Sequence, residues 1–166
     1  MKKSLTWGAL FLVAALGGCE TTADRDTRLP QGTSVTRFHL GQPIARGEIR
    51  VEPSSEGAAS PEFGQEEAAV GRELARLGWT VSPGKTTTEQ VALVRLNQTN
   101  RPGGGLATEL RVRIQRRSDA TVAWEGHAET ETRAGSTADR AALVDRLTAA
   151  LFRDFPGESG RTIRVR

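Results

Sequence analysis

The sequence predicts a two-layer α+β domain in which two helices cover one face of a mainly antiparallel sheet of five or six strands. Two amphipathic helical patterns, several runs of alternating apolar and polar residues, and short turns between them predict this class. A chain of 166 residues with 37% hydrophobic and 26% charged residues is typical of one globular domain. We therefore expect neither a disordered protein nor one that spans a membrane several times.

The first 18 residues have the order of an export signal. Lys2 and Lys3 precede an apolar run over residues 5–16, and small residues follow it. The run is shorter than the roughly 20 residues that cross a bilayer as a helix. The pattern predicts a leader that is removed, not a retained membrane helix.

The apolar region closes with Leu16, Gly17, Gly18 and Cys19. These residues resemble the lipobox of bacterial lipoproteins, and the resemblance implies a diacylglyceryl group on Cys19 and cleavage after Gly18. Cys19 is the only cysteine, so an exported chain can form no internal disulfide. The alternative is a secreted protein with an incidental free thiol. Acyl chains would hold the protein to membrane lipid without a membrane span.

The residues after Cys19 predict a tether and a location. Residues 19–34 contain few apolar side chains and show no periodicity, which indicates a flexible segment before a single domain over residues 35–166. In enterobacterial lipoproteins, Asp after the lipidated cysteine favours the inner membrane. Glu20 occupies that position here, so the resemblance favours the periplasmic face of the outer membrane.

Two runs rich in strand-forming residues begin the domain. Residues 35–40 alternate, with Thr36, Phe38 and Leu40 on one face, and residues 44–51 follow a turn at Gly41-Gln42-Pro43. We expect these two strands to be neighbours in the sheet.

The first helix is predicted from Ser60 and Pro61, an N-cap followed by proline at the first helical position. An apolar stripe continues to about Leu77, and Gly78 is placed to end the helix. A short extended segment over residues 79–81 follows.

The middle of the chain predicts a buried strand and a hairpin. Residues 91–96 are apolar on both faces except for Arg95, whereas residues 108–114 alternate strictly. A turn near residues 117–120 leads to a strand over residues 121–130, with Val122 and Trp124 facing inward. Folding back would place Arg111 or Arg113 opposite Glu125.

The last helix is predicted to start near Ser136 or Thr137, with Asp139 in its first turn. Its apolar stripe extends to Phe155, and Pro156-Gly157 would end it. Residues 162–165 are expected to return as a short edge strand.

The segments Val122-Ala-Trp124-Glu-Gly126 and Phe152-Arg-Asp-Phe155-Pro156, with Leu77-Gly78-Trp79 upstream, resemble a family of bacterial lipoproteins known as unknown-function domain 4136. The resemblance covers residues 35–156 and implies fold and location but no reaction. From the residues themselves, Trp124 is expected to fill the core, Gly126 to allow close packing, and Phe155-Pro156 to pack the helix end.

The inventory of side chains argues against an enzyme. No cysteine remains as a nucleophile, and Gly157-Glu-Ser159-Gly160 follows a helix and does not match a nucleophile elbow. Gly103-Gly104-Gly105 leads into a strand, whereas phosphate-binding loops open a helix. We expect no catalytic site and no cofactor apart from covalent lipid on Cys19.

Glu125, His127 and Glu129 share one strand face at two-residue spacing. This pattern fits either a metal or pH-sensing site, or a solvated face of mixed charge. A metal site needs a further ligand, and the only other histidine, His39, has no evident relation to these residues. The solvated face is the prediction, so no metal is expected.

Arginine dominates the basic residues, and Arg111, Arg113, Arg116 and Arg117 are candidates for contact with an anion or a partner. The formal net charge is +3, and removal of Lys2 and Lys3 leaves 21 basic and 20 acidic residues. A charge near +1 does not favour nucleic acid as a partner.

These observations predict a lipid-anchored, non-enzymatic protein that binds or scaffolds an envelope protein through a sheet edge or the charged sheet face. The alternative is a binder of a small molecule or lipid headgroup that uses a helix–sheet cleft or the arginine-rich face.

Overall fold

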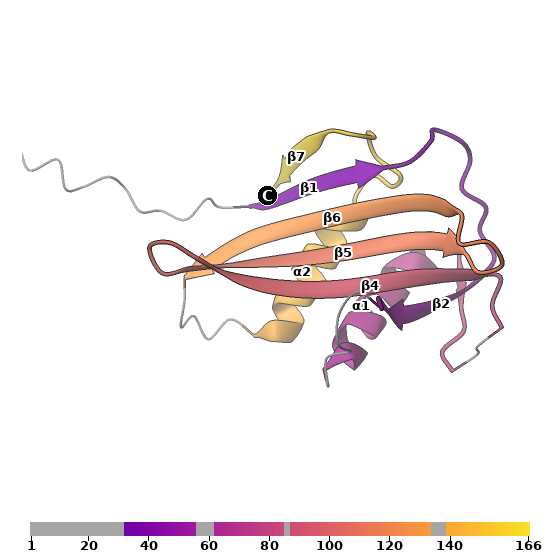
Figure 1. The fold of residues 1–166 in the computed structure, drawn as a ribbon, viewed down its shortest axis with the longest axis horizontal. Coiled ribbons are helices and arrows are strands. Elements are labelled where there is room, and N and C mark those ends of the chain that lie inside the picture. Colours follow the sequence, from indigo (N-terminus) through magenta and orange to yellow (C-terminus); the bar gives the residue numbers. More distant parts are fainter. Residues whose placement is uncertain (1–31, 56–61, 85–86, 134–138) are drawn as a thin grey trace, which may run out of the picture.

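The computed structural model describes residues 32–55, 62–84, 87–133 and 139–166. The strands are β1 (Thr33–Phe38), β2 (Glu48–Pro53), β3 (Thr80–Val81), β4 (Gln90–Arg101), β5 (Gly105–Arg116), β6 (Val122–Arg133) and β7 (Thr162–Val165), and the helices are α1 (Phe63–Arg76) and α2 (Arg140–Phe152). Both helices cover the same face of the sheet (Figure 1). The two-layer α+β class predicted from the sequence is confirmed. In these ranges, no helix combines the length and hydropathy that a membrane span requires.

One mixed sheet contains all seven strands in the order β3-β2-β4-β5-β6-β1-β7. Strand β2 runs parallel to β3 and β4, and the remaining pairs are antiparallel. The prediction of five or six strands was too low by at least one. The two-residue strand β3 lies in the segment over residues 79–81 that was predicted to be extended, and it pairs with Glu48 and Ile49.

The first two strands are not neighbours, contrary to prediction. Strands β4, β5 and β6 separate β1 from β2. The chain over residues 39–47 passes along the end of the sheet between them instead of making a tight turn (Figure 1). Strand β2 then pairs in parallel with β4, a pairing that a short hairpin cannot produce.

The buried face of β1 is the opposite of the one its larger apolar residues suggest. Val35 and Arg37 face the helices and are buried, whereas Phe38 is 46% exposed and Leu40 is 83% exposed. The Arg37 guanidinium donates from Nε to Leu151 O at 2.9 Å, and from Nη2 to Ala150 O at 3.0 Å and Arg153 O at 2.9 Å. A buried arginine is tolerated here because it satisfies carbonyls at the end of α2.

Helix α2 ends earlier than predicted, and Asp139 precedes its first turn. Asp139 is its N-cap and accepts a hydrogen bond from Ala141 N at 3.0 Å, so it does not lie in the first turn. The helix ends at Phe152, and Phe155 lies in the turn beyond it. The predicted starts at Ser136 or Thr137, and at Ser60-Pro61 for α1, lie outside the described residues.

An aromatic cluster occupies the core beneath the end of α2. Trp124 is fully buried and stacks on Phe152 with ring centroids 5.3 Å apart, and Phe155 packs 5.2 Å from the same tryptophan. The indole Nε1 donates to Pro156 O at 3.0 Å. A Cβ on Gly126 would lie 2.3 Å from Trp124 Cη2, so this strand position has no room for a side chain.

The two ends of the domain meet at one end of the sheet. Thr33 pairs with Val165 in the β1–β7 ladder, and β1 begins two residues before the predicted domain boundary at 35. The predicted leader, Cys19 and nearly all of the predicted tether lie outside the described residues. The start of β1 therefore lies beside the C-terminus (Figure 1).

Candidate interaction surface

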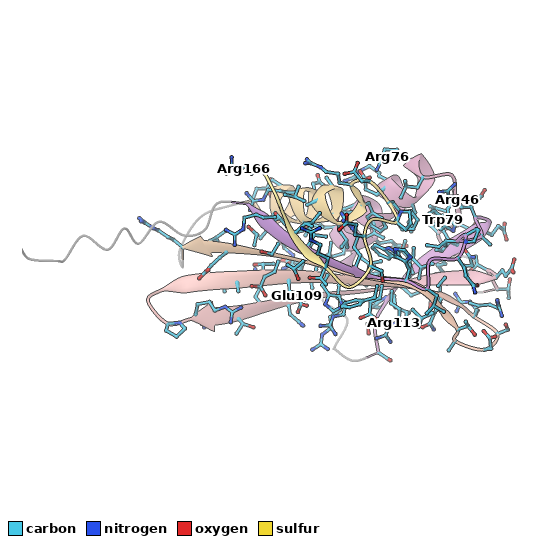
Figure 2. The ribbon with its side chains drawn as sticks, turned by 90° about the horizontal axis from the view of Figure 1, so that it is seen from above. Arg46, Arg76, Trp79, Glu109, Arg113 and Arg166 are labelled. Carbon is cyan, nitrogen blue, oxygen red and sulfur yellow. The ribbon has the colours of Figure 1, made fainter. Side chains whose placement is uncertain are left out.

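The face of the sheet without helices carries a network of charged side chains from two central strands, β5 and β6. We call this set the charged sheet face; its residues are Glu109, Arg111, Arg113, Glu125, His127 and Glu129. Figure 2 shows Glu109 and Arg113 on the side of the sheet opposite the helices. Period-2 alternation explains the placement, because Leu110, Val112 and Ile114 face the core from β5.

The register of the hairpin decides which charges meet. Arg113 lies opposite Glu125, Arg111 opposite His127, and Glu109 opposite Glu129. The predicted pairing of Arg111 or Arg113 with Glu125 is confirmed for Arg113. Val122, predicted to face inward, is 40% exposed because the register shifts next to Ile114 and Gln115.

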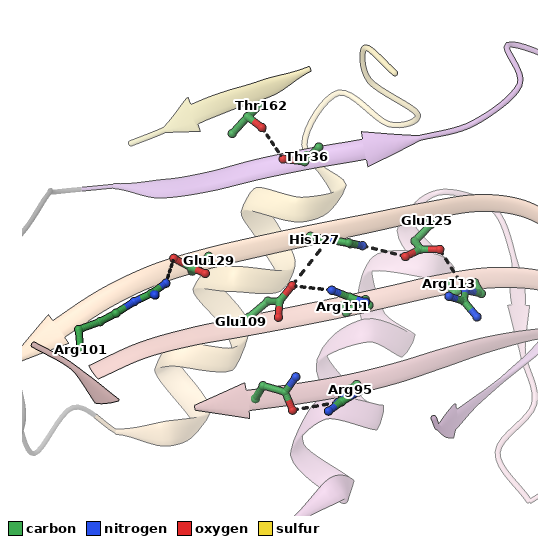
Figure 3. Close-up of polar contacts among 11 residues, drawn as sticks. Thr36, Arg95, Arg101, Glu109, Arg111, Arg113, Glu125, His127, Glu129 and Thr162 are labelled. Carbon is green, nitrogen blue, oxygen red and sulfur yellow. Dashed lines mark hydrogen bonds and ion pairs between the residues drawn. The ribbon is translucent and has the colours of Figure 1, made fainter. Parts of the chain in front are cut away.

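Glu125 and His127 are the centre of the network (Figure 3). Glu125 accepts from Arg113 Nε at 3.0 Å, and its other carboxylate oxygen lies 2.8 Å from His127 Nε2. Glu109 lies 3.7 Å from His127 Nδ1 and accepts from Arg111 Nη2 at 3.1 Å. The four contacts join five side chains into one continuous series of polar contacts.

Burial and hydrogen bonding act in opposite directions on Glu125. Partial burial by itself raises the pKa of this carboxyl, but hydrogen bonds from His127 and Arg113 and the nearby Arg113 charge lower it by more. The net result is a pKa below the usual value for glutamate. Glu125 is therefore a carboxylate at neutral pH.

The four arginines predicted as anion contacts do not form one cluster. Arg111 and Arg113 lie on the charged sheet face, whereas Arg116 and Arg117 lie at the end of β5 and beyond it. Each has a carboxylate partner: Glu109 for Arg111, Glu125 for Arg113, Asp119 for Arg116 at 2.9 Å, and Glu52 for Arg117 at 2.8 Å. The arrangement neutralises these guanidiniums within the protein.

The residues considered as ligands of a metal site bind different partners and do not come together. Glu129 accepts from Arg101 Nη2 at 3.1 Å and does not join Glu125 and His127. His39 is bound elsewhere, with Nε2 2.9 Å from Gly157 O and Nδ1 accepting from Gly41 N. Across the described ranges, no group of His, Cys, Asp and Glu has a metal-binding arrangement.

The sequence did not predict that Phe38 lies beside the charged sheet face. Phe38 follows Arg37 in β1, lies opposite Glu125 in the register, and presents its ring edge-on to His127 with centroids 5.9 Å apart. The alternation over residues 35–40 groups Phe38 with Thr36 correctly. It does not reveal that this is the open face, since an arginine occupies the core face.

No family model matches the chain, so the resemblance to unknown-function domain 4136 stays a prediction. An uncharacterized protein from Zymomonas mobilis, ZMO1243, is 47% identical over 62 residues. The match covers 36% of this chain and only 23% of that protein.

Solved structures show the fold in other proteins. The PelC dodecamer from Paraburkholderia phytofirmans has a TM-score of 0.51 at 14% identity, covering 71% of this chain and 93% of that one. A PDZ domain protein from Parabacteroides distasonis gives 0.53 at 9% identity, covering 80% of this chain and 39% of that one. The lipoprotein GNA1162 from Neisseria meningitidis gives a TM-score of 0.43 at 14% identity, covering 64% of this chain and 94% of that one.

Proposed function

We propose that this protein is a lipid-anchored, non-enzymatic binding or scaffolding component of a bacterial cell envelope, held at the periplasmic face of the outer membrane. The observation that carries the proposal is the sequence Leu16-Gly17-Gly18-Cys19 at the end of an apolar leader, with Cys19 the only cysteine. The resemblance to the lipoprotein family of unknown-function domain 4136 adds to this, although its motifs are structural.

The charged sheet face is the proposed contact with an envelope protein. It is left open by the helices, and it combines the paired charges around Glu125 with the exposed ring of Phe38. Polar contacts around an aromatic anchor are common in protein interfaces. Because the arginines already have carboxylate partners, the same face is less suited to a free anion. PelC, which has a similar fold, forms a dodecamer. Assembly into an oligomer is one way in which a protein of this fold can act as a scaffold.

A photo-crosslinking residue at Gln115 tests this contact in living cells. Gln115 lies on the open side of β5, whereas the control position, Arg146, is exposed on α2 in the other layer. We expect position 115 to give an adduct of defined mass. The yield of that adduct from position 146 should be severalfold lower. Equal adducts from both positions, or none from position 115, would contradict a contact through the charged sheet face.

A further inference from the structure

Strand β4 continues well past the end of its neighbour β2. Pairing with β2 stops at Val94, and Ser54 N donates the last bond to Val94 O at 2.8 Å. The rest of the strand, to Arg101, pairs on its other side with β5. Among the described residues, no strand covers the free side of β4 over residues 96–100 (Figure 1).

The bond to Val94 fixes the direction of the following backbone groups. In a ladder, alternate residues direct both N–H and C=O to the same neighbour. Since Val94 faces β2, the backbone groups of Leu96, Gln98 and Asn100 face the same way, toward the open edge. Three amides and three carbonyls therefore form a template for one more strand.

This edge lacks the features that protect the other sheet edges. Strand β3 has two residues, β2 ends in Pro53, and the four-residue strand β7 carries Arg164. By contrast, the sequence Leu96-Asn-Gln-Thr-Asn100 contains no charge and no proline. We name residues 96–100 the β4 edge.

We propose that the β4 edge pairs in antiparallel orientation with the β4 edge of a second copy of this chain, about a two-fold axis at Gln98. This register makes Gln98 face Gln98 of the second copy and Leu96 face Asn100 of the second copy. All three outward-facing residues of each copy then lie in hydrogen-bonded pairs, which exchange six backbone bonds. A two-fold axis at Asn97 or Thr99 would pair only two of the three.

At each end of the paired segment this register places two arginines opposite each other, and the repulsion between them is reduced because Arg101 already pairs with Glu129. Arg101 of the second copy lies opposite Arg95, the first residue past the last β2 pair at Val94. Glu129 pairs with Arg101 at 3.1 Å, and Arg95 donates to Asn97 at 2.9 Å, so neither guanidinium depends on the other copy for a partner. The inference concerns the folded domain and does not depend on the anchor.

Disulfide crosslinking of the full chain in its native membranes tests the two-fold axis. Opposed residues of a hydrogen-bonded pair have Cα atoms roughly 5.5 Å apart, which a disulfide can join. Under mild oxidation, Gln98→Cys is expected to give a species of twice the chain mass. Thr162→Cys on the β7 edge is the matched control, and the parent chain measures crosslinking through Cys19. A yield from Gln98→Cys no higher than from Thr162→Cys, or an adduct with a chain of another mass, would overturn the proposal.

Charged substitutions at Gln98 provide a second test, in which co-purification of two copies is measured. Gln98→Lys and Gln98→Glu each place like charges opposite one another and should reduce co-purification of two differently tagged copies severalfold. Co-expression of the lysine variant with the glutamate variant should restore it, whereas Arg146→Glu on the exposed side of α2 should leave it unchanged. Co-purification of the Gln98→Lys chain at the parent level would exclude this axis.

Discussion

Arg37 joins the first strand to the end of the last helix. Its three hydrogen bonds hold the carbonyls of Ala150, Leu151 and Arg153, which helix geometry leaves without intrahelical donors. Burial lowers the pKa of Arg37 from its ordinary value, with Asp154 raising it and Arg153 lowering it. Gly157 leaves room for this side chain, because a Cβ there would lie 2.6 Å from Arg37 Cδ.

Replacing Arg37 with methionine should destabilise the fold by about 3 kcal/mol, because buried carbonyls lose charged donors. Urea denaturation of the parent and variant chains measures the difference. Arg161→Met is the control, since its pair with Glu158 is exposed and should change stability by less than about 0.5 kcal/mol. Equal losses in the two variants would show that Arg37 does not stabilise the end of α2.

Glycines at two positions should respond to alanine with opposite signs. At Gly126, the added Cβ meets Trp124 at 2.3 Å and Leu151 Cδ1 at 2.7 Å, so Gly126→Ala should cost roughly 1–3 kcal/mol. At Gly64 in α1 nothing lies within 4 Å of the added Cβ, and Gly64→Ala should stabilise by roughly 0.5–1 kcal/mol. Thermal unfolding distinguishes them, and stabilisation by both would refute the close packing at Trp124.

The lowered pKa of Glu125 predicts how the stability of the protein changes as the pH falls. A carboxyl whose pKa is lowered by folding stabilises the protein above its unfolded pKa, and this contribution is lost as pH falls through the folded pKa. The parent should therefore lose more thermal stability than Glu125→Gln when the pH is lowered from 7 to about 3. An identical decrease in both proteins would mean that the Arg113–Glu125–His127 contacts add nothing to stability.

Helix α2 depends on its caps more than α1 does. Asp139 caps α2 through its side chain, whereas the N-cap of α1, Glu62, makes no side-chain cap bond. Asp139→Ala should cost about 1 kcal/mol in the free energy of unfolding. Asp139→Asn keeps the oxygen acceptor and should recover most of that loss in the same denaturation assay. Failure of asparagine to recover it would mean that the cap bond is not the cause.

Elements were predictable where one periodic pattern dominated. The alternation over residues 108–114 correctly gave β5 its core face, and the short run over residues 162–165 gave β7. Strand order was not predictable, because residues 39–47 carry no signal that distinguishes a hairpin from a crossing of the sheet. The end of α2 was predicted too late because Phe155 continues the apolar spacing of the helix. The carbonyls at the helix end instead accept hydrogen bonds from Arg37, which is distant in sequence.

The sequence indicated which charged residues lie on the candidate surface, but not which of them pair with one another. The pattern of Glu125, His127 and Glu129 showed that charges share one strand face. Their partners depend on the register of β6 against β5 and on β4, from which Arg101 contacts Glu129. Arginines that looked available for an anion in the sequence are paired in the fold. Arg113 and Arg117 have partners on other strands, whereas the partner of Arg111 is two residues away on β5 and that of Arg116 is three residues away.

At the scale of the whole molecule, the fold fixes where the first described strand begins relative to the proposed contacts. The predicted tether leads to Thr33, the first residue of β1, which pairs with Val165 near the C-terminus. The exposed side chain of Phe38 lies at the other end of that strand. The predicted tether would therefore join the domain at the end of β1 that lies away from Phe38.

Intact mass combined with membrane fractionation of the native protein, beside Cys19→Ala, tests the anchor most directly. We expect the native chain to begin at Cys19, carry acyl mass and sediment with outer membrane, whereas Cys19→Ala remains unlipidated. A native protein that is soluble and has a free thiol at Cys19 would contradict it.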